Sequence, residues 1–184
     1  VAILAPQGVD YVAAFFAAVH AGNVAVPLFA PALAGHTERL AAVLSDTKPS
    51  AVLTTTAAAE AVRAFIKTLP AAERPRVIAV DAVPGTLAEM HVDPDSRTDD
   101  VAYLQYTSGS TRTPAGVMIT NDNLFANFEQ IMTAYYGVYG KLAPPGSTVV
   151  SWLPFYHDMG FFLGLIMPIL TGMPAKLTSP IGFL

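Results

Sequence analysis

The feature that most constrains the fold is an alternation of short apolar runs with helical segments along the chain. The runs are apolar throughout rather than at every second position, which is typical of strands buried on both faces. The expected strands are 1–4, 23–29, 51–56, 76–82, 101–107, 116–120 and 147–154. The expected helices are 9–22, 35–50, 57–69, 121–137 and 159–170, and 93–100 is expected to be a loop.

This order predicts an α/β fold with a mostly parallel sheet, helices on both of its faces and right-handed crossovers. Local signals support the helix boundaries. Asp10 lies near the start of the first helix and Gly22 follows its end, while Thr120 or Asn121 can cap the helix at 121–137.

Composition narrows the class of protein. Charged residues make up only 13% of the 184 residues, about half the usual share, so the chain either buries most of itself or has further protein covering its apolar surface. The net charge of −4, without a basic run, excludes nucleic-acid binding through a phosphate-neutralising patch. The absence of cysteine fits a reducing compartment, and we expect a cytoplasmic protein. The longest apolar stretch, 159–170, is too short to span a bilayer and contains Pro168.

A polar segment follows the expected strand 101–107, within the stretch "YTSGSTRTPAGVMIT". Backbone N–H groups near Gly109 and Gly116, hydroxyl groups and the single cation Arg112 suit phosphate oxygens. The same composition suits a solvated hairpin loop, and spacing alone leaves both interpretations open. A Walker A loop is excluded because the glycines are seven apart, no lysine follows and the next run is strand-like. A GxSxG nucleophile elbow is also absent.

A second polar segment, "LPFYHDMG", follows the expected strand 147–154 and contains His157 and Asp158. Ligands in such sheets bind beyond the carboxyl ends of the strands, so we expect the two segments to share one crevice. Adjacent side chains in an extended segment point apart, so adjacency alone does not make His157 and Asp158 a catalytic pair. A lone histidine is more often structural or merely exposed.

No metal-ligating set is expected within the chain. The histidines and carboxylates lack the sequence spacing of a metal site, and His20, His36 and His91 receive no role. The apolar helix at 159–170 is expected to be part of the core. It could also line a pocket for an alkyl chain, with Met159, Phe161 and Phe162 as candidate wall residues.

The quoted motifs together resemble a known family. "YTSGSTRTPAGVMIT" resembles the phosphate-binding signature of the adenylate-forming enzymes, which include acyl-CoA synthetases, peptide-synthetase adenylation domains and luciferases. "VAILAPQGVDYVAAFFAAVHAGNVAVPL" and "SWLPFYHDMGFFLGLIMPILTGMPAKL" are similar to two further segments of that family, in the same order. Arg112 and Ala115 stand where many members have glycine and lysine. This form, with the HDMG run, is similar to the fatty acyl-AMP ligases.

The resemblance implies roles for residues at both segments. It implies that ATP phosphates are held by Thr107, Ser108, Gly109, Ser110 and Thr111, with Arg112 and Gly116 in the same loop. It places His157 near the substrate carboxylate and the α-phosphate, with Asp158 supporting it. The implied substrates are Mg²⁺-ATP and a fatty acid, and the implied products are acyl-AMP and pyrophosphate.

The resemblance also implies a partner and a domain context. Acyl-AMP in this group usually passes to an acyl carrier protein, often ahead of a polyketide synthase. A fatty acyl-CoA ligase is the alternative enzyme, and a non-catalytic lipid-binding adenylation fold is the alternative of another class. The family's adenine, ribose and metal residues and its C-terminal lysine come later than residue 184. We therefore expect residues 1–184 to be a fragment of one N-terminal domain, without metal ligands and inactive alone.

Overall fold

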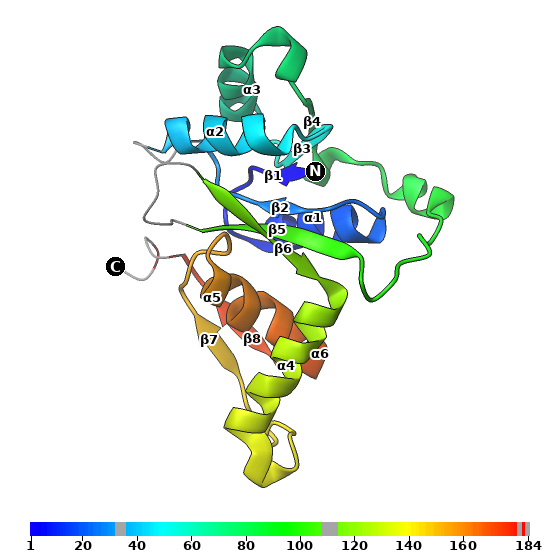
Figure 1. Ribbon diagram of the computed structural model, residues 1–184, viewed down its shortest axis with the longest axis vertical. Helices are drawn as coiled ribbons and strands as arrows, with labels where there is room; N and C mark the ends of the chain where they lie inside the picture. Colours follow the sequence, from blue (N-terminus) through cyan, green and yellow to red (C-terminus); the bar gives the residue numbers. More distant parts are fainter. Residues whose placement is uncertain (32–35, 108–113, 180–181, 183–184) are drawn as a thin grey trace.

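The computed structural model describes residues 1–31, 36–107, 114–179 and 182, and it shows helices on both faces of a central sheet (Figure 1). Four strands, β1 (Ala2–Ile3), β2 (Val26–Pro27), β3 (Ala51–Thr54) and β4 (Arg76–Ala79), pair in parallel in the order β2-β1-β3-β4. The α/β class, the parallel sheet and the helices on both faces are confirmed. No helix in the described part of the chain is long and apolar enough to cross a membrane.

The sheet continues beyond β2 through β5 (Val101–Thr107). The Ala25 N–H donates to the Ala102 carbonyl at 3.0 Å, and the Leu104 N–H donates to the Ala25 carbonyl at 2.8 Å. β5 then pairs antiparallel with β6 (Ala115–Thr120), with Thr107 opposite Ala115. The antiparallel β5–β6 pair is the exception to the parallel order that the sequence predicts.

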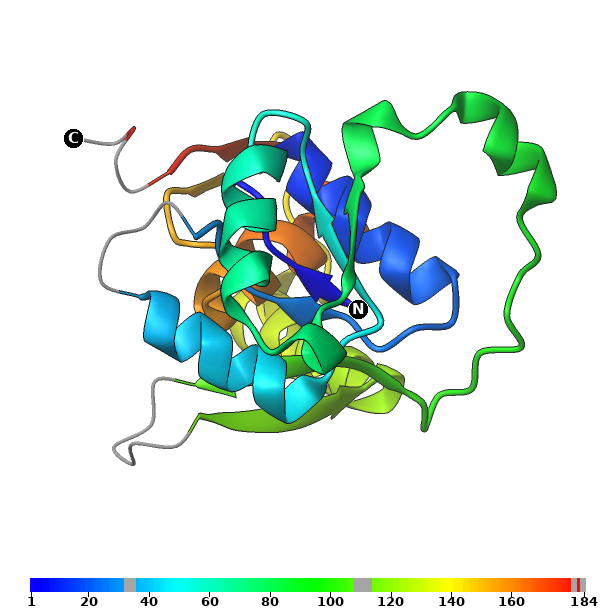
Figure 2. The same ribbon diagram turned by 90° about the horizontal axis from the view of Figure 1, so that it is seen from above.

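Alternate residues of the strands face two separate cores. Ala2 and Leu4 pack in the core beneath α2 (Thr37–Thr47) and α3 (Ala59–Thr68). Ile3 and Ala5 pack in the opposite core, beneath α1 (Val9–His20) and the helix that begins at Asp158. Both faces of β1 are therefore buried, and this explains its uninterrupted apolar run in the sequence. Figure 2 shows the helices on the two sides of the sheet from above.

The helix boundaries follow their local signals. At the end of α1, the Gly22 N–H donates to Val19 and the Asn23 N–H donates to Ala18, which is a Schellman motif with Gly22 in the left-handed region at φ 69°. The helix α4 (Asn121–Tyr136) begins with a capping box in which Thr120 and Asn123 bond reciprocally. Thr120, rather than Asn121, is therefore the N-cap.

The last part of the described chain departs in detail from the sequence prediction. β7 (Val149–Ser151) pairs in parallel with an unpredicted strand, β8 (Ala175–Leu177), in a separate two-stranded sheet. The predicted apolar helix comprises α5 (Asp158–Phe161), a π-helical segment Phe162–Ile166 and α6 (Met167–Thr171). The π-helical segment precedes Pro168, which has no N–H to donate to the Gly164 carbonyl.

Candidate active site

Described residues of the two polar segments singled out in the sequence line one open pocket of about 110 Å³. Thr107 comes from the end of β5, and His157 and Asp158 come from the start of α5. The remaining lining residues are Arg39, Gln105, Tyr106 and Tyr156. The structure thus brings the ends of β5 and β7 to one crevice, as predicted, even though β7 belongs to a separate sheet.

A buried glutamine joins the two segments. Gln105 is 5% exposed, and its Nε2 donates to the Tyr156 carbonyl at 2.9 Å. This bond holds Tyr156, the residue before His157, against the C-terminal end of strand β5. The Oε1 atom of Gln105 is buried without a hydrogen-bond partner in the described structure, beside the pocket that the residue lines. Sequence reasoning missed this residue, because a single polar side chain in an apolar strand was not weighed as a signal.

His157 and Asp158 lie in direct contact, contrary to the argument that neighbouring side chains point apart. The His157 Nδ1 lies 2.6 Å from an Asp158 carboxylate oxygen. The same oxygen accepts from the Met159 N–H at 2.7 Å. The argument fails because His157 is the extended N-cap of α5 and Asp158 is its first helical residue, so the backbone turns between them. Both side chains are more than half exposed to the pocket and solvent.

Tyr106 lines the pocket, and Tyr103 is buried close enough to Asp158 for its charge to act on the phenol. Burial raises the pKa of Tyr103 to about 12, and the negative charge of Asp158 adds to this rise, so the Tyr103 phenol stays protonated at neutral pH. Tyr106 donates its hydroxyl to the Asp46 carboxylate, and burial together with that acceptor raises the pKa of Tyr106 well above its usual value. An Arg39 guanidinium nitrogen lies 3.5 Å from the Tyr106 carbonyl and brings a positive charge to the pocket wall. Sequence reasoning missed Arg39, since nothing near it in the chain marks the site.

Five of the predicted phosphate-binding residues, Ser108, Gly109, Ser110, Thr111 and Arg112, lie outside the described residues. Thr107 precedes them and lines the pocket. Gly116 lies opposite Tyr106 in the β5–β6 pair, where a Cβ atom would come within 2.9 Å of the Tyr106 ring. The structure therefore provides a packing reason for glycine at position 116.

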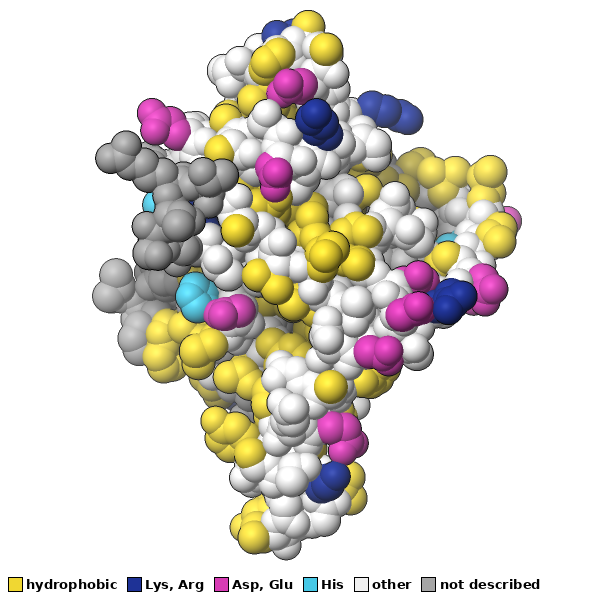
Figure 3. Space-filling model, viewed as in Figure 1, with side chains coloured by type: hydrophobic (Ala, Val, Ile, Leu, Met, Phe, Trp, Pro, Cys, Tyr) yellow, Lys and Arg dark blue, Asp and Glu magenta, His cyan; other side chains and the backbone are white. Residues whose placement is uncertain are grey.

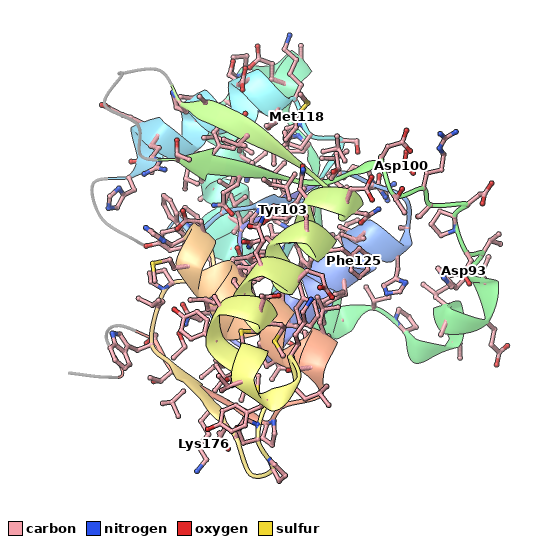
Figure 4. All side chains as sticks on the ribbon, turned by 60° about the horizontal axis from the view of Figure 1, so that its bottom comes forward. Asp93, Asp100, Tyr103, Met118, Phe125 and Lys176 are labelled. Carbon is pink, nitrogen blue, oxygen red and sulfur yellow. The ribbon has the colours of Figure 1, made fainter. Side chains whose placement is uncertain are left out.

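The three candidate acyl-pocket residues differ in their surroundings. Phe161 and Phe162 are buried in the core, where the Phe161 ring packs edge-on against Phe15 with centroids 4.6 Å apart. Met159 is 54% exposed. A separate apolar pocket of about 130 Å³ lies between α1, α4 and α6, with Phe16, Leu124, Phe125, Ile166 and Leu170 among its walls. Figure 4 shows Phe125 on α4 and Tyr103 at the centre of the fold.

Comparisons with known proteins agree with the resemblance seen in the motifs. The family model described as AMP-binding enzyme matches residues 1–181. A putative fatty-acid–CoA ligase, FadD25 of Mycobacterium tuberculosis, is 59% identical over 99% of this chain and 32% of its own length. The long-chain-fatty-acid–AMP ligase FadD32 of Mycolicibacterium smegmatis is 54% identical over 92% of this chain and 26% of its own length.

The fold agrees with that of a solved enzyme. The crystal structure of a fatty acyl-adenylate ligase from Legionella pneumophila, in complex with acyl adenylate and pyrophosphate, superposes with a TM-score of 0.82 and 29% identity. The match covers 99% of this chain and 30% of the crystal structure's chain. The chain therefore spans about a third of the length of the relatives it matches.

Proposed function

The chain belongs to the AMP-binding enzyme family, and on this premise we propose that it is part of a fatty acyl-AMP ligase. The proposed reaction is attack of a fatty carboxylate on the α-phosphorus of Mg²⁺-ATP. The carboxylate oxygen forms a bond to phosphorus, the bond to the bridging oxygen breaks, and pyrophosphate leaves. We propose that the acyl group of acyl-AMP is then transferred to an acyl carrier protein, which can be the carrier protein of a polyketide synthase.

The observation that supports the proposal is the shared pocket at the ends of β5 and β7. Thr107 opens the segment whose motif resembles the phosphate-binding signature, and His157 lies across the same pocket. Arg39 contributes a positive charge at its wall. An anionic substrate and a polyphosphate can therefore be held side by side in this pocket. Positioning the two reactants together and placing positive charge beside them both lower the barrier to reaction.

The proposed chemistry needs positioned donors rather than a protein nucleophile. Negative charge redistributes over the phosphoryl oxygens in the transition state, and preorganised N–H and O–H donors stabilise it without reorganising. We propose that His157 acts as an imidazolium, which donates from both ring nitrogens: Nδ1–H to Asp158, 2.6 Å away, and Nε2–H to the substrate carboxylate or the α-phosphate. Gln105 then positions this pair through the Tyr156 carbonyl.

A fatty acyl-CoA ligase is the second candidate, and similarity to FadD25, a putative fatty-acid–CoA ligase, favours it. Arg112, Ala115 and the run from His157 to Gly160 favour the AMP ligase, because they match the subgroup that stops at the adenylate. The two enzymes share the adenylation step and differ in the acceptor.

The test is to incubate the full-length protein with ATP, Mg²⁺ and dodecanoate, with and without CoA, and to separate the products. We expect ATP–pyrophosphate exchange that depends on dodecanoate, and acyl-AMP as the dominant product even with CoA present. Dodecanoyl-CoA as the dominant product would establish the CoA ligase instead. Lack of any exchange would leave only the non-catalytic lipid-binding alternative. Because each buried CH₂ contributes about 0.8 kcal/mol, acetate should be a poor substrate.

A further inference from the structure

Two histidines and an aspartate that are far apart in the sequence meet beside the end of α1. His20 lies in the last turn of α1, whereas His91 and Asp93 lie in the segment that joins the β4 region to β5. One potential ligand atom from each residue lies within 4.8 Å of the others. We infer that these three residues form a binding site for a divalent transition-metal ion of the Zn²⁺ class, which goes beyond the proposed ligase activity.

The geometry is close to what such an ion requires. Zn²⁺ binds imidazole nitrogen at about 2.0–2.1 Å in a tetrahedral arrangement, so its ligand atoms lie about 3.3 Å from one another. The His91 Nε2 and the Asp93 Oδ1 are already 3.1 Å apart. The His20 ring lies next to the His91 ring, with centroids 6.4 Å apart. All three side chains are exposed, so a change in the His20 rotamer can close the remaining distance without disturbing the core.

The fold holds the two parts of the site together by packing that does not involve the ligands. Gly22, in the left-handed region just beyond α1, faces Pro94, whose Cβ atom lies 3.1 Å from the position of an added Cβ. Pro94 follows Asp93 directly, so this contact docks the carboxylate beside the end of the helix. Figures 1 and 2 show segment 83–100 arching around the end of α1, and Figure 4 shows Asp93 on that arch.

The electrostatic surroundings favour a cation. Residues 81–100 contain six acidic side chains, Asp81, Glu89, Asp93, Asp95, Asp99 and Asp100, and one basic side chain, Arg97. Figure 3 shows acidic side chains gathered over this segment at the right-hand edge. His20 also lies at the C-terminal end of a 12-residue helix, where the helix dipole is negative. Both effects raise the local concentration of cations.

The ligand types decide the class of ion. Two imidazoles and one carboxylate suit Zn²⁺ and its neighbours, whereas Mg²⁺ and Ca²⁺ prefer sites made of oxygen ligands alone. Three protein ligands leave a fourth position for water, which is the composition of an open zinc site. The bound ion would tie segment 83–100, which leads into β5, to the end of α1.

The test is a Zn²⁺ titration of the metal-stripped full-length protein against a chromophoric zinc chelator, with His20→Ala, His91→Ala and His36→Ala variants. His36→Ala is the matched control, because His36 is an exposed histidine on the other side of the sheet that packs against Phe29. We expect wild type and His36→Ala to bind one more equivalent of Zn²⁺ than the other two. In those two variants, affinity at this site should fall at least about tenfold, since even loss of an outer-shell partner costs about 10–100-fold.

A second readout separates binding from folding. Zn²⁺ should protect segment 83–100 from limited proteolysis in wild type and His36→Ala, and 10-fold more Mg²⁺ should not replace it, in line with the ligand types. Circular dichroism without metal should be the same for all four proteins. The inference is overturned if His20→Ala and His91→Ala bind Zn²⁺ with wild-type stoichiometry and affinity, or if wild type binds none. His91 and Asp93 would then be only an exposed ion pair, which contributes little to stability.

Discussion

At the residue scale, His157 and Asp158 show how a change of backbone conformation alters what neighbouring residues can do. His157 has extended dihedral angles, φ −97° and ψ 139°, and Asp158 begins a helix. Their side chains therefore converge on one side, and the carboxylate accepts from the imidazole while it also caps the Met159 N–H. Asp158 consequently orients His157 without lying deeper in the protein.

We predict that His157→Ala slows adenylation by about 10²-fold or more, because removal of one oriented donor to a developing charge typically costs about 10²–10³ in rate. The measurement is fatty-acid-dependent ATP–pyrophosphate exchange by the full-length protein. The free energy of unfolding should change by no more than about 0.5 kcal/mol, because the side chain is more than half exposed. His36→Ala serves as the control and should exchange at the wild-type rate. A His157→Ala enzyme within a few-fold of wild type would remove His157 from the proposed mechanism.

At the element scale, the start of α5 packs unusually close to the chain that precedes it. A Cβ atom at Gly160 would lie 2.1 Å from the Pro154 carbonyl oxygen and 2.9 Å from the Leu153 Cβ. Only glycine allows α5 to approach the end of the β7 segment this closely. The glycine of the HDMG run thus has a packing role: it lets the start of α5 pack against Leu153 and Pro154, which follow β7.

We predict that Gly160→Ala lowers the free energy of unfolding by about 3 kcal/mol, the upper end of the usual cost of overpacking, because the clash is with backbone. Gly164→Ala is the matched control in the same apolar helix. Its added Cβ would meet Ser151 Oγ at an ordinary contact distance of 3.5 Å, so its stability should change by less than about 1 kcal/mol. Urea denaturation of both variants measures the difference. If the two variants had equal free energies of unfolding, α5 could move away from Pro154 to accommodate the added methyl group without loss of stability.

At the scale of the whole molecule, large apolar side chains are exposed on both faces of the β5–β6 pair and on α4. Val117 and Met118 on β6 are 47% and 67% exposed, and Phe125 on α4 is 55% exposed. Figure 3 shows hydrophobic side chains around β5 and β6. These exposed side chains fit the low charge of the sequence and a chain that spans about a third of the length of its relatives. Large exposed apolar patches often mark surfaces that bind other protein.

We predict that residues 1–184 alone do not bind ATP with micromolar affinity and form no acyl-AMP, because the chain spans about a third of the length of its relatives and the motif resemblance assigns the adenine and ribose residues to the remainder. Isothermal titration calorimetry of the isolated chain with Mg²⁺-ATP provides the measurement, with the full-length protein as the positive control. Gel filtration at increasing concentrations should also show self-association through the exposed apolar side chains. Micromolar binding of ATP by the isolated chain would show that the pocket at β5 and α5 is sufficient by itself.

The sequence by itself determined the order and type of most elements and the position of the candidate site. Strands that are buried on both faces need unbroken apolar runs, so the sequence alone predicts them. Helix ends favour glycine or a capping side chain, so Gly22 and Thr120 could be identified as helix boundaries from the neighbouring sequence alone. Thr107 and His157 each lie in a polar segment that follows a strand, and ligands in α/β folds bind beyond the strand ends, so the sequence indicated that the two segments share one crevice.

Only the tertiary structure decided which distant residues meet. Nothing near Arg39 or Gln105 in the chain marks them, yet both line the pocket, and the Gln105 bond to Tyr156 connects residues 51 positions apart. The residues His20, His91 and Asp93 have no metal-binding spacing in the sequence, and only the tertiary structure brings the three side chains together. Contacts between distant segments depend on how whole elements pack, and a local pattern of residue types does not record that packing.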